Sequence, residues 1–118
     1  GTAAYGAAKA GVDSLTQSLA MEWGPQVRVN AITVGLCRTD QTADHYGGDE
    51  TVAAIERTIP LGRMADPREI GTTALFLASQ LASYVSGATV ECHGGGEFPV
   101  FQYVLNHALA ASDTNQEG

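Results

Sequence analysis

Apolar residues recur at steps of three and four between residues 4 and 23, a period that predicts an amphipathic helix. The residues that recur are Ala8, Val12, Leu15, Leu19 and Trp23. Gly24-Pro25 is expected to end this helix, since Pro cannot continue it and Gly readily adopts a left-handed cap. Gly6 and Gly11 each cost about 1 kcal/mol relative to Ala, which predicts close approach by another backbone or a ligand, or simple tolerance of the cost.

Two β-branched stretches predict strands. Residues 27–34 carry apolar side chains on both alternating faces, the pattern of a strand covered on two sides in a parallel sheet. A helix followed by such a strand is half of a βαβ unit, so the expected fold class is α/β. Residues 88–93 form a second candidate strand, which Gly94-Gly95-Gly96 ends. No helix with a Lys-Ser/Thr pair follows these glycines, so they predict a turn or close packing rather than a phosphate cradle.

A further helix is predicted between the two strands. Asp66-Pro67-Arg68-Glu69 supplies a cap, a Pro at the first helical position and the Glu of a capping box. The helix is expected to run to about Leu81. Its inward-facing residues are predicted to be Ile70, Ala74, Leu77, Ala78 and Leu81.

Residues 40–62 are expected to form an excursion at the carboxyl edge of the sheet, where ligands bind in open α/β folds. Within it, residues 41–48 are polar and predict a loop, and residues 49–59 predict a short helix capped by Asp49. Such an excursion suits a substrate lid, although an ordinary surface loop explains the same pattern. Residues 97–118 are expected to be a tail, in which Pro99 opens a candidate helix and the polar end is disordered.

Composition narrows the classes of function. Among 118 residues, six are Lys or Arg and thirteen are Asp or Glu, for a net charge of −7. This sign disfavours nucleic acid and anionic membranes as partners, and no apolar run approaches the roughly 18 residues of a membrane span. Cys37 and Cys92 lack metal-ligand spacing, so we expect two buried thiols, no metal site and a cytoplasmic location. Because the first residue is Gly1 rather than Met, we expect a processed chain, a fragment or the ordered part of a longer protein.

Tyr5 and Lys9 are the candidate catalytic pair. Four residues apart on a helix, they share one face, with Cβ atoms roughly 5–6 Å apart. A phenol titrates near pH ~10 and a nearby cation favours its anionic form, so such a pair makes tyrosine usable as an acid or base near neutral pH. On its own the spacing is common, and a half-buried aromatic beside a solvated lysine is the simpler interpretation.

An ordered set of short motifs decides between these interpretations. The motifs are Tyr5-x-x-x-Lys9, Ser14-Leu15-Thr16, Leu19-Ala20-x-Glu22, Arg28-Val29-Asn30-Ala31-Ile32, Gly35, Thr39, Pro60-Leu61-Gly62-Arg63, Pro67-x-Glu69-Ile70, Phe76-Leu77-Ala78-Ser79, Tyr84-Val85-Ser86-Gly87 and Gly94-Gly95. Over residues 1–96 this order closely resembles the carboxyl-terminal half of a short-chain dehydrogenase/reductase, of the type that includes 3-oxoacyl carrier-protein reductases. The resemblance implies a doubly wound, parallel-sheet domain of Rossmann type. It also implies hydride transfer between NAD or NADP and a small carbonyl or alcohol substrate.

By the same resemblance, Tyr5 is the acid/base that protonates the nascent alkoxide or deprotonates the alcohol. Lys9 holds the nicotinamide-ribose hydroxyls and favours the ionised form of Tyr5 by its charge. The implied cofactor-binding residues are Tyr5, Lys9, Gly35, Leu36, Cys37 and Thr39. In the last four, a backbone segment holds the nicotinamide carboxamide, and a threonine hydroxyl contacts the carboxamide or the diphosphate.

The chain also departs from the family pattern. Val34 stands where Pro is usual before Gly35, and the turn is still expected to form. The glycine-rich diphosphate turn, the residue that selects NAD or NADP, the catalytic serine and the relay asparagine belong before Gly1. We therefore expect an amino-terminal half to supply them, and the isolated chain to be inactive.

Two kinds of assembly remain open. The resemblance implies a homodimer or homotetramer with subunit contacts through the helix from Asp66 and the strand from Ala88. The alternative is a truncated, non-catalytic interaction module that associates through its exposed helix and strand.

Overall fold

The computed structural model describes residues 2–96, 99 and 102, which form two compact units. Of the described residues, the first unit comprises 2–37 and 65–93, and the second comprises 38–64, 94–96, 99 and 102. The predicted tail of residues 97–118 lies outside the described residues, apart from positions 99 and 102. Within the described part, none of the helices has the length and apolar character needed to cross a bilayer.

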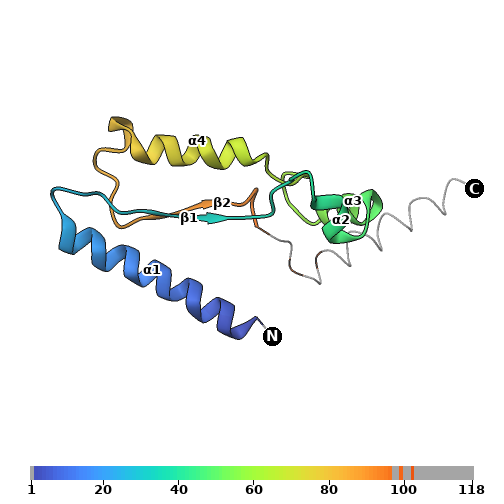
Figure 1. The fold of residues 1–118 in the computed structure, drawn as a ribbon, viewed down its shortest axis with the longest axis horizontal. Helices are drawn as coiled ribbons and strands as arrows, with labels where there is room; N and C mark the ends of the chain where they lie inside the picture. Colours follow the sequence, from blue (N-terminus) through green and yellow to red (C-terminus); the bar gives the residue numbers. More distant parts are fainter. Residues whose placement is uncertain (1, 97–98, 100–101, 103–118) are drawn as a thin grey trace, which may run out of the picture. The chain divides into compact units, whose positions relative to one another are not determined.

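A two-stranded parallel sheet lies at the centre of the first unit. β1 (Ala31–Val34) pairs with β2 (Thr89–Cys92), so that Ala31 lies opposite Thr89 and Val34 opposite Cys92. α1 (Ala3–Trp23) covers one face of this sheet and α4 (Pro67–Ala78) covers the other (Figure 1). α4 lies in the crossover connection that the parallel strands β1 and β2 require, and the predicted α/β fold class is confirmed.

Alternation along β2 joins the sheet to both helices. The hydroxyl of Thr89 donates a hydrogen bond of 2.9 Å to Asp13 of α1. Three residues later, the Cys92 sulfur lies 3.5 Å from the Thr73 hydroxyl of α4. Because successive side chains of a strand point to opposite faces, these two contacts hold one helix on each side of the sheet.

β1 is shorter than the predicted strand of residues 27–34, because side chains replace the regular ladder at its start. Asn30 donates from Nδ2 to the Val85 carbonyl at 2.9 Å and accepts from the Ala88 N–H at 3.1 Å. The Arg28 guanidinium donates to the same Val85 carbonyl at 3.0 Å. These bonds hold the chain in place without strand geometry, and the sequence pattern of alternating apolar residues does not reveal them.

The predicted start of α4 is confirmed in detail. The Asp66 carboxylate accepts from the Arg68 N–H at 2.8 Å, and the Glu69 carboxylate accepts from the Asp66 N–H at 2.9 Å. Both bonds of the capping box are therefore present, with Pro67 in the first turn.

α4 ends before the predicted Leu81. The Ser79 hydroxyl accepts from the Leu81 N–H at 3.2 Å and begins a short 3-10 helix, η1 (Gln80–Ala82). Of the predicted inward residues, Leu77 is buried and Ile70 is half-buried, whereas Ala74, Ala78 and Leu81 are exposed. This face of α4 is apolar along its length, but the described residues bury only part of it.

The apolar stripe of α1 is also only partly covered. Val12, Leu15 and Trp23 are each about half exposed, and the residue of α1 that is buried is Thr16. The Thr16 hydroxyl donates to the carbonyl of Val12, one turn earlier, at 2.9 Å. A polar side chain can therefore occupy the buried position, since its hydroxyl bonds within the helix itself.

Gly24 differs from its predicted cap, and Gly6 and Gly11 have no close neighbour in the described part of the chain. Gly24 has φ −69° and ψ 148°, an extended conformation rather than a left-handed cap, so Pro25 is what stops the helix. At Gly6 and Gly11, no described heavy atom lies within 4 Å of the position that a Cβ would take. No close approach within this part of the chain accounts for them.

The second unit contains α2 (Thr42–Tyr46) and α3 (Asp49–Glu56). The prediction of a loop at residues 41–48 is wrong, because a Thr pair starts a helical turn there. The Thr39 N–H donates to the Thr42 hydroxyl at 2.7 Å, and Gly47 ends α2 in a left-handed conformation with φ 86°. Asp49 is the first residue of α3 rather than its cap, a position that Gly48 takes.

Apolar packing and one carboxylate hold the second unit together. Val52, Ile59 and Met64 are buried. The Glu56 carboxylate accepts from the Arg38 guanidinium at 3.1 Å and from the Met64 N–H at 3.2 Å. Residues 38 and 64, the two ends of this excursion, therefore meet at one side chain.

Gly94 and Gly95 form a turn, as predicted. Their φ angles are 68° and 97°, in the left-handed region that favours glycine. A Cβ on Gly94 would lie 2.9 Å from Ile59, and one on Gly95 would lie 2.8 Å from Pro60. Both the positive φ and the close packing require glycine, so the prediction of a turn with close packing is confirmed.

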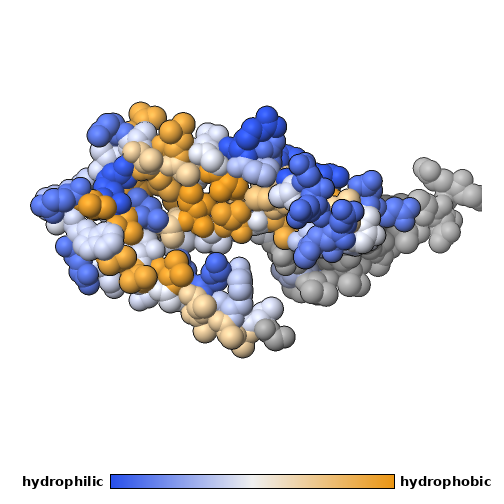
Figure 2. Space-filling model, in the orientation of Figure 1, coloured by the Kyte–Doolittle hydropathy of each residue, from blue (hydrophilic) through white to orange (hydrophobic). Residues whose placement is uncertain are grey.

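Large hydrophobic side chains are exposed on the first unit. Hydrophobic residues gather over α4 and the sheet on the face shown in Figure 2. The exposed fraction is 70% at Leu75, 84% at Leu81 and 103% at Tyr84. Exposed apolar surface of this kind is typical of sites that contact another polypeptide, a membrane or a ligand.

Replacement of Asp66 by Ala is expected to lower the free energy of unfolding by about 1 kcal/mol, because the cap of α4 is lost. Asp66→Asn is the matched control, since Asn caps as well as Asp. Urea denaturation followed by circular dichroism measures both variants. Equal losses in the two variants would contradict a capping role.

Candidate active site

Tyr5 and Lys9 are neighbours on one face of α1. The Lys9 ammonium nitrogen lies 5.3 Å from the centroid of the Tyr5 ring. Tyr5 is 67% exposed, so the pair is accessible from solvent. An ammonium at this distance interacts with the ring electrostatically, and the contact follows from the four-residue spacing.

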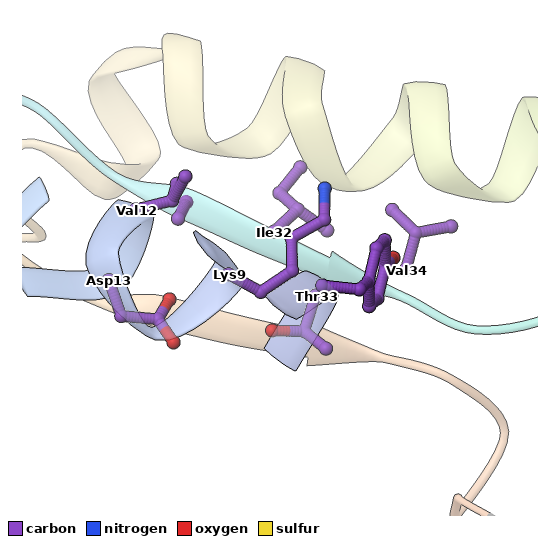
Figure 3. Close-up of a pocket in the computed structure, with 8 residues that line it drawn as sticks. Lys9, Val12, Asp13, Ile32, Thr33 and Val34 are labelled. Carbon is purple, nitrogen blue, oxygen red and sulfur yellow. The ribbon is translucent and has the colours of Figure 1, made fainter. Parts of the chain in front are cut away.

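The pair lies in a groove between α1 and β1 with a volume of about 480 Å³. Lys9 extends from α1 over β1, and Asp13 follows it one turn along the helix (Figure 3). The groove is lined by Tyr5, Lys9, Val12 and Asp13 from α1 and by Ala31, Ile32, Thr33 and Val34 from β1. One cation, one carboxylate and two hydroxyls thus share an otherwise apolar groove, a combination that can bind hydroxyl groups of a ligand.

Residues 35–37 continue directly from the β1 wall of the groove. The Gly35 N–H donates to the Cys92 carbonyl at 3.1 Å, and the Leu36 carbonyl accepts from the Ala65 N–H at 2.9 Å. A Cβ on Gly35 would lie 2.7 Å from the Cα of His93, so only glycine fits there. The backbone of this segment is therefore held from both sides, and no turn is assigned at residues 35–39.

Thr39 is the one predicted site residue that belongs to the second unit. Its hydroxyl lies 3.2 Å from the hydroxyl of Thr42, and its N–H donates to the same side chain. The first unit thus contains Tyr5, Lys9 and residues 35–37, and Thr39 shapes the start of α2.

Asp13 and Thr33 line the groove and were missing from the predicted site. The signal for Asp13 was available, since it follows Lys9 by four residues and so shares its face. Thr33 had no such signal, because its place beside the helix depends on how α1 packs on the sheet.

His93 is a third polar residue that was not among the predicted site residues. Its Nε2 lies 3.1 Å from the Glu91 carboxylate, and its Nδ1 is buried without a hydrogen-bond partner in the described part of the chain. In that part, no three His, Cys, Asp or Glu side chains gather where they could hold a metal ion.

Cys37 lies in a partly buried, acidic environment. Burial, the largest cause, raises the pKa of its thiol, and the nearby Cys92, Asp66 and Glu69 raise that pKa further. Both cysteines are free thiols, as predicted, but they are half-buried rather than buried. The Cys37 thiol is therefore less ionised at neutral pH than an ordinary cysteine.

A profile of the family described as Enoyl-(Acyl carrier protein) reductase matches residues 1–97. The chain is 47% identical over 92 residues to an uncharacterized short-chain type dehydrogenase/reductase of Sinorhizobium fredii, a match that covers 77% of this chain and 36% of that protein. It is 43% identical over 101 residues to 3beta-hydroxysteroid dehydrogenase 1 of Eggerthella lenta, covering 84% of this chain and 39% of that protein. The chain thus spans less than two fifths of the length of these relatives.

Solved structures agree with these matches. A 4-hydroxyisoleucine dehydrogenase complexed with NADH shares 32% identity and a TM-score of 0.69, over 79% of this chain and 39% of its own. An NADPH-bound short chain oxidoreductase from Pseudomonas aeruginosa shares 39% identity and a TM-score of 0.70, over 79% of this chain and 38% of its own.

The chain belongs to the short-chain dehydrogenase/reductase family. Its parallel strands and flanking helices form the carboxyl-terminal part of that family's doubly wound, Rossmann-type domain. The resemblance stated from the motif order is therefore confirmed.

Alkylation of Cys37 by iodoacetamide is expected to be slower at pH 8 than alkylation of free cysteine. The raised pKa means a smaller thiolate fraction, and the rate should keep rising at pH values where free cysteine has reached its plateau. Peptide-resolved mass spectrometry measures the rate at each pH. A plateau at or below the pH found for free cysteine would contradict the assigned environment.

Proposed function

We propose that this chain carries the acid/base pair of an oxidoreductase that transfers a hydride between NAD or NADP and a carbonyl or alcohol substrate. The observation that carries the proposal is the pairing of Tyr5 and Lys9 in one solvent-accessible groove. Membership of a family with NADH-complexed and NADPH-bound structures supports it.

Tyr5 is the acid/base of the proposed site. In reduction its hydroxyl gives a proton to the oxygen that gains charge as the carbonyl is reduced, and in oxidation the phenolate takes a proton from the alcohol. The high exposure of Tyr5 allows a substrate oxygen to reach the hydroxyl.

Lys9 has two proposed roles. Its positive charge, close to the ring, is proposed to stabilise the negative charge that forms on the Tyr5 oxygen during proton transfer. Its three N–H donors also suit the paired hydroxyls of a ribose, which the groove can admit. Lys9 is the only lysine of the chain, so no other ammonium can replace it here.

The proposed cofactor fits the residues that follow β1. A residue with a Cβ does not fit at position 35. Among the described residues, the N–H groups of Leu36 and Cys37 have no hydrogen-bond partner. Such N–H groups can hold a carboxamide oxygen, and the Thr39 hydroxyl is proposed as a further contact of the carboxamide or the diphosphate. When bound, the nicotinamide ring supplies the hydride donor or acceptor.

Further features of the whole protein are part of the proposal. Residues 1–96 form the carboxyl-terminal half of the oxidoreductase domain, with residues 40–62 as a substrate lid. An amino-terminal half of the same protein completes the cofactor site, and the assembly is a cytoplasmic homodimer or homotetramer. The exposed hydrophobic side chains of α4 and η1 support contact with further polypeptide.

The same exposed side chains favour a second candidate function, a non-catalytic module that only associates. Both candidates predict that the isolated 118-residue chain is inactive, so the deciding measurement is made on the intact protein. Nicotinamide-dependent turnover by the intact protein, abolished by Tyr5→Phe, rules out the non-catalytic module.

In the intact protein, Tyr5→Phe is expected to lower kcat by about 10²- to 10⁴-fold, the range that general acid/base catalysis supplies. Cofactor affinity, measured by fluorescence titration, should stay nearly unchanged because the ring remains. Tyr84→Phe is the matched control, since Tyr84 is fully exposed outside the groove. Lost cofactor binding with a retained rate would overturn the assignment.

Lys9→Met is expected to weaken cofactor binding and slow the reaction together, and to change the pH–rate profile, because both proposed roles depend on the ammonium. Arg57→Met makes the same charge change in the second unit and serves as the control. Steady-state kinetics between pH 6 and pH ~10 tests the effect across the range where a phenol titrates. An unchanged profile in Lys9→Met would count against its action on Tyr5.

A further inference from the structure

One hydrogen bond joins α1 to the sheet among the described residues. The Thr89 hydroxyl of β2 donates to the Asp13 carboxylate of α1 at 2.9 Å, across 76 positions of sequence. The other side-chain hydrogen bonds of α1, made by Thr16 and Ser18, stay within the helix.

The part of α1 that precedes Asp13 has few other restraints. Residues 2–12 are all exposed, and Asp13 is the first half-buried residue along the helix. Thr2, the residue before the helix, makes no side-chain cap bond. Gly6 and Gly11 leave open space where a side chain could have packed. Within the described residues, the segment that carries the proposed catalytic pair is therefore first held at Asp13.

Helix geometry connects this contact to the site. Tyr5, Lys9 and Asp13 follow one another at steps of four and line the same groove. At 1.5 Å per residue, Lys9 lies roughly 6 Å and Tyr5 roughly 12 Å from Asp13 along the helix axis. A rotation or shift of the helix at Asp13 therefore moves both groups relative to β1.

We propose that the Asp13–Thr89 hydrogen bond sets the position of α1 on the sheet and so places Tyr5 and Lys9 for reaction. Asp13 and Thr89 are then positioning residues of the site, and this inference rests on the proposed function. Asp13 does not act through a salt bridge with Lys9, since no ion pair joins the two in the described part of the chain.

The test uses the intact protein and five variants. Thr89→Val removes the hydroxyl and keeps the shape, and it should lower kcat about tenfold or more, as small displacements of reacting groups do. Asp13→Ala should lower kcat equally, and the double variant should lose no more than either single one. Thr89→Ser restores the hydroxyl and should restore kcat, and Gln17→Ala, on an exposed position of the next turn, is the control.

Two readouts separate positioning from general destabilisation. The pH–rate profile of Thr89→Val should change in the same direction as that of Lys9→Met, which lost stability alone would not produce. Amide hydrogen exchange of residues 3–12, measured without cofactor or turnover, should quicken in Thr89→Val and stay unchanged in Thr89→Ser.

Other results would overturn the inference. Slower turnover in Asp13→Ala with normal turnover in Thr89→Val would show that the carboxylate acts without the hydrogen bond, and additive losses would show the same. A wild-type protein with no nicotinamide-dependent turnover would refute the proposed function. Exchange that is equal in Thr89→Val and wild type would refute the positioning role separately.

Discussion

The parallel register between β1 and β2 is the constraint on which the first unit depends. Side chains alternate along each strand, so this register directs Thr89 toward α1 and Cys92 toward α4. A slip of one residue would reverse the two faces of a strand. It would separate Thr89 from Asp13 and leave the wall of the groove with different side chains. The site thus depends on a long-range pairing, even though its two proposed catalytic groups come from one short helical segment.

Features that depend on nearby residues could be predicted from the sequence. The proximity of Tyr5 and Lys9 follows from helical spacing, and the start of α4 follows from the reach of Asp66 and Glu69 to adjacent N–H groups. The glycine turn after β2 could be predicted for the same reason. The order of motifs along the chain went further and indicated the family, which the comparisons confirm.

Features that depend on distant partners could not be predicted in the same way. The start of β1 is set by Asn30, whose amide bonds to a segment more than fifty residues away. The polar stretch after Arg38 forms a helix because Thr39 and Thr42 bond to each other, a pairing that a loop-like composition hides. The buried position of α1 is taken by Thr16, since its hydroxyl is satisfied inside the helix. In each case one specific hydrogen bond outweighs the average preference of the residues.

The Glu56 carboxylate has a consequence for how the second unit can vary. Because it bonds to both Arg38 and Met64, it closes two loops of the chain, residues 38–56 and residues 56–64. Doubling the length of a flexible closed loop costs only about 0.6 kcal/mol in closure entropy. A change in the length of the chain between Arg38 and Glu56 is therefore cheap in closure entropy, provided that Val52 keeps its buried place in α3.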